Sequence, residues 1–133
     1  MVRNLTAIDL FSGAGGFSLA AHNAGVDVLA AIEFDQKAAE THQKNLVERL
    51  GAPTQVFAQD ITKVDIHSIM RYQGILEGEL DILLGGPPCQ GFSSHRINGS
   101  GKDDPRNALL FRYFDFVKHL QPKAFLVENV PGL

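Results

Sequence analysis

The chain has 133 residues, 44% hydrophobic and 20% charged, which fits one soluble globular domain with a core of its own. It has no apolar run near the ~20 residues that span a bilayer, no secretory signal at its start and a single cysteine. These features exclude a disulfide framework and predict a cytoplasmic protein without a membrane partner. The 12 Lys and Arg against 15 Asp and Glu give a net charge of −3, without the basic surplus of a self-sufficient DNA-binding domain.

Apolar, β-branched segments alternate with segments of helical period along the chain. Strands are predicted at residues 5–11, 27–34, 55–58, 80–84 and 124–128, and helices at 17–23, 35–50, 66–72 and 107–120. Residues 90–105, rich in Gly, Ser, Asp and Lys, predict a long loop. Alternating strands and helices with continuous apolar strands predict an α/β fold, a doubly wound, mostly parallel sheet covered by helices on both faces.

Unusual residues follow or end each predicted strand. A Gly-rich turn, residues 12–16, follows the first strand, Glu33 ends the second, Asp60 follows the third, residues 87–89 follow the fourth and Glu128 ends the fifth. Because ligands of such sheets bind at the carboxyl ends of the strands, we expect the functional site at this edge.

The first two strand ends have the features of a nucleotide site. Gly13 and Gly15 allow close approach of a ligand at a helix N-terminus, and Glu33, about twenty residues on, can accept from both ribose hydroxyls. The dinucleotide fingerprint G-x-G-x-x-G fails at its third glycine, where Ser18 stands. Alone, the turn is also a tight strand-to-helix connection and Glu33 a solvated carboxylate; together they favour ribose binding.

Three further residues have two interpretations each. Phe11 and Phe34 flank the turn and the carboxylate, and either provide flat apolar surfaces for an adenine or pack in the core. Asp60 either accepts from the adenine amino group or caps the segment that follows it.

Cys89 is the sharpest feature of the reactive end. A lone cysteine is commonly a buried, inert thiol. This one follows two prolines that fix φ, and glycines on both sides allow another molecule to approach closely. The setting favours rigid presentation of a nucleophile.

Residues 9–16 (DLFSGAGG), 87–93 (PPCQGFS) and 128–130 (ENV) together resemble the DNA (cytosine-5)-methyltransferase family in order, spacing and strand-end placement. The resemblance covers essentially the whole chain. It implies the Rossmann-like fold of S-adenosyl-L-methionine-dependent methyltransferases, S-adenosyl-L-methionine as cofactor, no metal, and double-stranded DNA with a flipped cytosine as substrate. Residues 91–93 look more like bacterial DNA enzymes, which act in restriction-modification systems, than like relatives that methylate tRNA.

The resemblance also implies roles for individual residues. Cys89 attacks C6 of cytosine, Glu128 binds or protonates N3, and Asn129 braces the Cys89 loop. The implied cofactor-binding residues are Phe11, Gly13, Gly15, Gly16, Glu33, Phe34, Asp60, Ile61, Pro87 and Leu109. The implied DNA-binding residues are Gln90, Ser93, Arg96 and Arg106.

The chain departs from the family after its fifth strand. The later arginine motif, the target-recognition domain and the C-terminal cofactor motif are absent, so residues 1–133 are expected to be the N-terminal part of a catalytic domain. If the fifth strand lies at the sheet edge, residues 124–127 would expose backbone and apolar side chains. We therefore expect the chain to be inactive alone and to need the remainder of the enzyme or a complementary subunit.

The sequence leaves alternatives open for origin and function. The chain is a part cut from a longer enzyme, one subunit of a split methyltransferase, or a gene fragment. A non-catalytic cofactor-binding or assembly subunit would keep the fold without the chemistry, but the presence of both Cys89 and Glu128 argues against it. An NAD-dependent oxidoreductase is disfavoured by Ser18 and has no use for the Pro-Pro-Cys segment.

Overall fold

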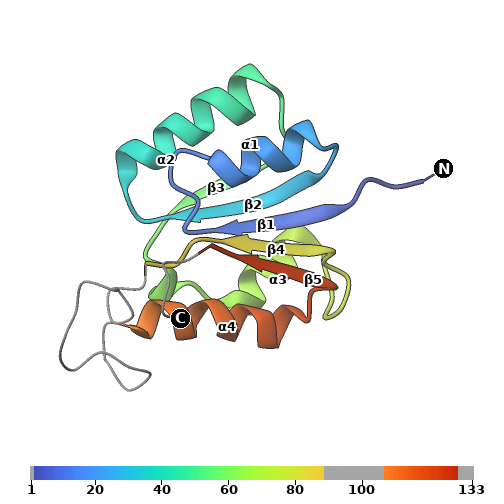
Figure 1. The fold of residues 1–133 in the computed structure, drawn as a ribbon, viewed down its shortest axis with the longest axis vertical. Coiled ribbons are helices and arrows are strands. Elements are labelled where there is room, and N and C mark those ends of the chain that lie inside the picture. Colours follow the sequence, from blue (N-terminus) through green and yellow to red (C-terminus); the bar gives the residue numbers. More distant parts are fainter. Residues whose placement is uncertain (1, 89–106, 129–133) are drawn as a thin grey trace.

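A computed structural model of the chain describes residues 2–88 and 107–128. All neighbouring strands pair in parallel, and their order in the sheet is β3-β2-β1-β4-β5 (Figure 1). The strands are β1 (Thr6–Leu10), β2 (Asp27–Glu33), β3 (Gln55–Ala58), β4 (Ile82–Gly85) and β5 (Ala124–Val127). The helical segments are α1 (Gly16–Asn23), α2 (Gln36–His42), the π-helical η1 (Gln43–Arg49), the 3₁₀ turn η2 (Ile61–Lys63), α3 (Ile66–Gln73) and α4 (Ala108–Leu120).

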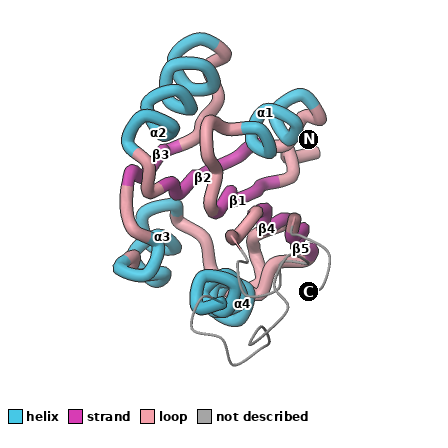
Figure 2. The backbone as a smooth tube through the Cα atoms, turned by 60° about the vertical axis from the view of Figure 1, so that its left-hand side comes forward, coloured by secondary structure: helices cyan, strands magenta, loops and turns pink. Residues whose placement is uncertain are grey.

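The strand order reverses direction at β1. From there the chain runs outward through β2 to β3, then returns to the other side of β1 for β4 and β5. Helices α1 and α2 cover one face of the sheet, and α3 and α4 cover the other (Figures 1 and 2). This arrangement confirms the predicted doubly wound parallel sheet and creates a switch point between β1 and β4, where open α/β sheets bind ligands.

The two faces of the sheet bury different amounts of apolar surface. The larger cluster lies under α3 and α4, where Ile8 and Leu10 of β1 meet the fully buried Tyr113 and Phe116 of α4. The opposite face is covered by α1 and has a smaller cluster around Ala7, Val28 and Leu84. The alternation along β1 therefore fixes which helix covers which face.

Asp81 ties the amino ends of β1, β4 and β5 together. Its buried carboxylate accepts from the backbone nitrogen of Thr6 at 2.9 Å and pairs with Arg3 at 2.7 Å and Lys123 at 2.6 Å. These bonds hold the pKa of Asp81 well below its usual range, chiefly through Arg3 and then Lys123. This network lies at the start of β4, which begins at Ile82 rather than at the predicted residue 80.

One other predicted element differs from the structure. The helix expected over residues 35–50 is α2 followed by the π-helical η1, and η2 was not predicted. The predicted loop at residues 90–105 lies outside the described residues. The remaining boundaries agree with the prediction to within one residue.

Strand β5 lies at one edge of the described sheet, as expected, and it is poorly covered. Phe125 is 51% exposed and Leu126 is 47% exposed, while Phe114 of α4 stacks edge-on against Phe125 at 6.0 Å between ring centroids. Within residues 2–88 and 107–128, no helix has the length and hydropathy of a membrane span.

Gly85 provides a test of the packing between β4 and α4. A Cβ atom there would lie 2.6 Å from Cε2 of Tyr113 and 2.9 Å from the backbone oxygen of Leu10. The Tyr113 hydroxyl donates to the backbone oxygens of Leu83 and Leu126, so the ring cannot move aside without breaking these bonds.

We expect Gly85→Ala to lower the free energy of unfolding by about 1–3 kcal/mol, the usual cost of overpacking, measured by urea denaturation of the chain. Gly16→Ala is the matched control, because nothing lies within 4 Å of a Cβ there and its φ is negative. Equal stability of the two variants would contradict the described packing.

Candidate functional site

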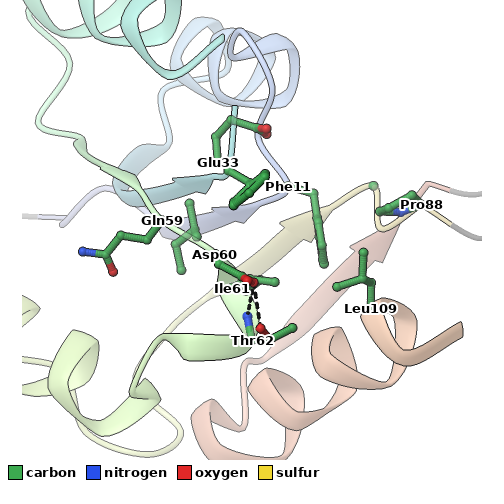
Figure 3. A pocket seen from close by; sticks show the side chains of 11 residues that line it. Phe11, Glu33, Gln59, Asp60, Ile61, Thr62, Pro88 and Leu109 are labelled. Atoms are coloured by element: carbon green, nitrogen blue, oxygen red, sulfur yellow. Dashed lines mark hydrogen bonds between the residues drawn. The ribbon is translucent and has the colours of Figure 1, made fainter. Parts of the chain in front are cut away.

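A cavity of about 550 Å³ opens at the carboxyl ends of the strands. In Figure 3, Glu33 lies above it, the turn with Asp60 and Thr62 below it, and Pro88 and Leu109 to the right. Six of the ten predicted cofactor residues line it: Phe11, Glu33, Phe34, Asp60, Ile61 and Leu109. Five lining residues were not predicted: Ile32, Gln59, Thr62, Gly86 and Pro88.

Glu33 joins the two turns that begin the site. One carboxylate oxygen accepts from the backbone nitrogen of Gly13 at 2.7 Å, and the other accepts from the backbone nitrogen of Asp35 at 3.0 Å. An ionised carboxylate has about four acceptor positions, so each oxygen keeps capacity for one more donor. Glu33 can therefore hold the Gly-rich turn in place and still accept from a ligand's hydroxyls.

Asp60 caps η2, which is one of its two predicted roles. Its Oδ1 accepts from the backbone nitrogen of Thr62 at 3.0 Å and from the Thr62 hydroxyl at 2.7 Å. These bonds to the charged form lower the pKa of Asp60, so the group is ionised at neutral pH. Because Asp60 also lines the cavity, capping does not exclude contact with a ligand.

The two phenylalanines differ in their surroundings. Phe11 has a φ of 54°, a left-handed conformation that is strained for a bulky residue, and its ring both lines the cavity and packs against the main core. Phe34 is 73% exposed, so its ring is not a core residue. Both rings thus offer apolar surface to the cavity.

The three glycines of the turn, Gly13, Gly15 and Gly16, differ in backbone conformation and in the space around them. Gly13 has a φ of 56° and open space where a Cβ would stand, and Gly16 is also open. At Gly15, with a φ of 102°, a Cβ would lie 3.0 Å from Leu46 and 3.1 Å from His42. The close approach at Gly15 is therefore to α2 and η1. These glycines and Pro87 are not lining residues, although Gly86 and Pro88 beside Pro87 are.

Glu128 extends the pairing of β5 with β4, because its backbone nitrogen donates to the oxygen of Gly85 at 3.0 Å. Its side-chain Oε2 lies 3.2 Å from where a Cβ on Gly86 would stand. Since Gly86 lines the cavity, the Glu128 carboxylate lies next to that wall. Six predicted residues lie outside the described residues: Cys89, Gln90, Ser93, Arg96, Arg106 and Asn129.

A buried acid lies beneath the Gly-rich turn. Oδ2 of Asp9 accepts from the hydroxyl of Ser18 at 2.6 Å, while no described residue bonds to the buried Oδ1. Burial raises the pKa of Asp9 to about 6. Burial also lowers the pKa of His42, whose Nδ1 lies 3.2 Å from the Ser12 hydroxyl. Neither Asp9 nor His42 was predicted as a site residue from the sequence.

The unpredicted lining residues are neighbours of predicted ones. Ile32 and Gln59 directly precede Glu33 and Asp60, and Thr62 is the residue that Asp60 caps. Gly86 and Pro88 flank Pro87. In the sequence, these five residues are marked only by their position near the end of a predicted strand. None of them had been assigned a role in ligand binding from its side chain.

The lining residues give the cavity a negative character. Among residues 2–88 and 107–128, the lining residues include two carboxylates, Glu33 and Asp60, and neither lysine nor arginine. Such a site favours a neutral or cationic ligand with hydroxyl or amino donors over a phosphate. No group of three or more potential metal ligands occurs in the described part of the chain.

The family model described as C-5 cytosine-specific DNA methylase matches residues 5–133. The type II methyltransferase M1.HphI of Haemophilus parahaemolyticus is 41% identical over 98% of this chain and 33% of its own length. M.AgeI of Thalassovita gelatinovora is 41% identical over 97% of this chain and 28% of its length. The chain thus spans about a third of these relatives.

Two solved structures are similar. A prophage-encoded E. coli protein described as a DNA modification methyltransferase has a TM-score of 0.76 and 40% identity, and covers 97% of this chain and 33% of its own. A SAM-dependent methyltransferase of Agrobacterium tumefaciens, 24% identical with a TM-score of 0.62, covers 97% of this chain and 39% of its own, and shares the fold.

The raised pKa of Asp9 predicts how stability changes with pH. The folded state binds this proton more tightly than the unfolded state, whose pKa is near 3.8, so folding gains from Asp9 at low pH. As the pH rises from about 4 to above 6, this gain is lost, up to about 3 kcal/mol of unfolding free energy.

We expect Asp9→Asn, which keeps an acceptor for Ser18, to lose this part of the pH dependence in denaturation measured from pH 4 to 8. Ser18→Ala should make the dependence steeper, because the hydrogen bond from Ser18 favours the ionised form. Identical pH profiles for all three proteins would contradict the assignment.

Proposed function

The chain belongs to the C-5 cytosine-specific DNA methylase family, and on that premise we propose that it binds S-adenosyl-L-methionine and supplies the thiol for methylation of cytosine C5 in DNA. The observation that carries the proposal is the cavity at the switch point, with its apolar rings and two carboxylates, next to the segment that leads into Cys89.

The cavity fits the cofactor's adenosine. Glu33 would accept from the ribose hydroxyls and Asp60 from the adenine amino group, while Phe11, Phe34 and Leu109 would pack against the ring. Its negative lining suits the positive sulfonium. When bound, the cofactor supplies a methyl group that a carbon nucleophile can accept.

The same features argue against a dinucleotide. A pyrophosphate needs backbone N–H groups at the turn or a cation beside it, whereas the N–H of Gly13 is bonded to Glu33. The carboxylates of Glu33 and Asp60 would repel its charge. An NAD-dependent activity is therefore not supported by the site.

Cys89 is the nucleophile in this proposal. Its thiolate forms a bond to C6 of the cytosine, which makes C5 electron-rich, and Glu128 donates a proton to N3 to neutralise the charge that develops. When C5 takes the methyl group, the bond from that methyl to the donor sulfur breaks and S-adenosylhomocysteine is released. A base then removes the C5 proton, N3 returns its proton to Glu128, and the C6–S bond breaks, which releases the thiolate. The position of the Glu128 carboxylate beside the lining residue Gly86 supports this role.

The substrate in this proposal is double-stranded DNA with the target cytosine rotated out of the helix, because a stacked base exposes neither face to a thiolate. Asn129 would brace the Cys89 loop. Gln90, Ser93, Arg96 and Arg106, which follow Cys89, would contact the DNA. With a net charge of −3, the chain would depend on other parts of the enzyme for most phosphate contacts.

The partner in this proposal is the remainder of a methylase, as part of the same chain or as a complementary subunit. The chain spans about a third of its first curated relatives, and Phe125 and Leu126 on β5 are half-exposed apolar residues at a sheet edge. The relatives are type II methyltransferases, so we place the activity in a bacterial restriction-modification system in the cytoplasm. Alone, the chain would transfer no methyl group.

A trapping experiment tests the proposal. The chain is mixed with the C-terminal part of a homologous methylase, S-adenosyl-L-methionine and DNA that contains 5-fluorocytosine. Because fluorine cannot leave C5 as a proton does, the Cys89 adduct should persist and shift the protein on a denaturing gel. Cys89→Ser should form no adduct while it binds S-adenosyl-L-methionine with unchanged affinity.

An adduct formed equally by Cys89→Ser would show that the nucleophile is another residue. A non-catalytic subunit would be favoured by a different result. In that case the unsubstituted chain would bind the cofactor but form no adduct, and control DNA with ordinary cytosine would stay unmethylated in the same mixture.

A further inference from the structure

The wall of the cavity that holds Asp60 and Ile61 is a short segment. Turn η2 has three residues, and its own backbone bonds are the nitrogen of Lys63 to the oxygen of Asp60 at 2.9 Å and the nitrogen of Val64 to the oxygen of Ile61 at 3.4 Å. The second of these is long for an N–H···O bond. The turn therefore gains its position from contacts with other elements.

Arg112 of α4 makes that contact. Its Nε donates to the backbone oxygen of Ile61 at 2.9 Å, and its Nη2 donates to the backbone oxygen of Val64. These two carbonyls begin and end the turn, so one planar guanidinium holds both ends of it. Bonds from a charged donor are stronger than those between neutral groups.

The guanidinium is itself held in place. Its central carbon lies 5.1 Å from the ring centroid of the fully buried Phe116, and Nη1 lies 3.7 Å from the carboxylate of Asp115. The Arg112 side chain is 20% exposed. A lysine could bond one carbonyl but could not span both and stack on the ring.

Helix α4 also contributes to the cavity directly. Leu109, three residues before Arg112 and so on the same side of the helix, is a lining residue. The same side of α4 therefore contributes Leu109 to one wall of the cavity and Arg112 to the clamp, the pair of hydrogen bonds that holds the turn with Asp60.

We propose that Arg112 is a positioning residue for the cofactor: through the carbonyls of Ile61 and Val64 it fixes the Asp60 turn at the distance from Leu109 that an adenine requires. The inference rests on the proposed function for the identity of the ligand. The clamp itself rests only on the contacts of Arg112.

Two readouts on the 133-residue chain test this. The first is hydrogen exchange without ligand: Arg112→Met, which keeps length and removes the donors, should lose protection at the amides of Lys63 and Val64 but keep it at the sheet. The second is calorimetric binding of S-adenosylhomocysteine, which we expect to weaken by roughly tenfold or more in Arg112→Met. Arg112→Lys should restore part of both.

Arg71→Met is the matched control, because Arg71 on α3 is an exposed arginine paired with Asp65 at 3.7 Å and is not a lining residue of this cavity. It should change neither readout. If Arg112→Met fails to fold, Arg112→Lys decides, with a smaller loss in the same two readouts.

Unchanged exchange at Lys63 and Val64 in a folded Arg112 variant would overturn the clamp. Lost protection with unchanged ligand affinity would overturn its role in positioning. Failure of the unsubstituted chain to bind S-adenosylhomocysteine even with the C-terminal part of a homologous methylase supplied would overturn the proposed cofactor and with it the role in binding, while the exchange result would still decide the clamp.

Discussion

The site depends on the two hydrogen bonds that the Glu33 carboxylate accepts from the backbone. By accepting from the backbone nitrogens of Gly13 and Asp35, it fixes the turn after β1 against the turn after β2, at the strand ends where the sheet order reverses. An apolar side chain there would leave the Gly13 N–H without its partner and the turn without a brace. The same carboxylate lines the cavity, so a structural bond and a ligand-binding group are one residue. Arg112 of α4 holds the turn with Asp60 in a similar way, because its guanidinium donates to the backbone oxygens of Ile61 and Val64.

A Gly-rich turn alone does not distinguish a dinucleotide from S-adenosyl-L-methionine, but the charge of the site does. Phosphate-binding turns keep their N–H groups for the ligand, whereas here a carboxylate of the protein bonds one of them. A ligand of this cavity must therefore bring hydroxyl or amino donors, and a positive centre is favoured. Buried Asp9, held near Ser18 beneath the turn, adds a further acidic group close to the site. These features are consistent with the methylase family without any appeal to a single residue.

Much of the fold could be predicted from the sequence, because the strands are short apolar runs that end at Gly, Pro or acidic residues. The split of residues 36–49 into α2 and η1 could not be predicted, because the apolar residues keep one helical period through both segments. The cavity residues with an evident chemistry, such as Glu33 and Asp60, were predicted from their places at the ends of predicted strands. Arg112 was not, because its function is to bond the backbone of a turn about fifty residues earlier, which leaves no local pattern.

In the proposed function, the cavity between Glu33, Asp60 and Leu109 holds the adenosine of the methyl donor. A crystal structure of the chain with S-adenosylhomocysteine tests this most directly. We expect the ribose hydroxyls within about 3.2 Å of the Glu33 carboxylate and the adenine between Phe34 and Leu109, with its amino group toward Asp60. A nucleoside bound at another place, with this cavity left vacant, would contradict it.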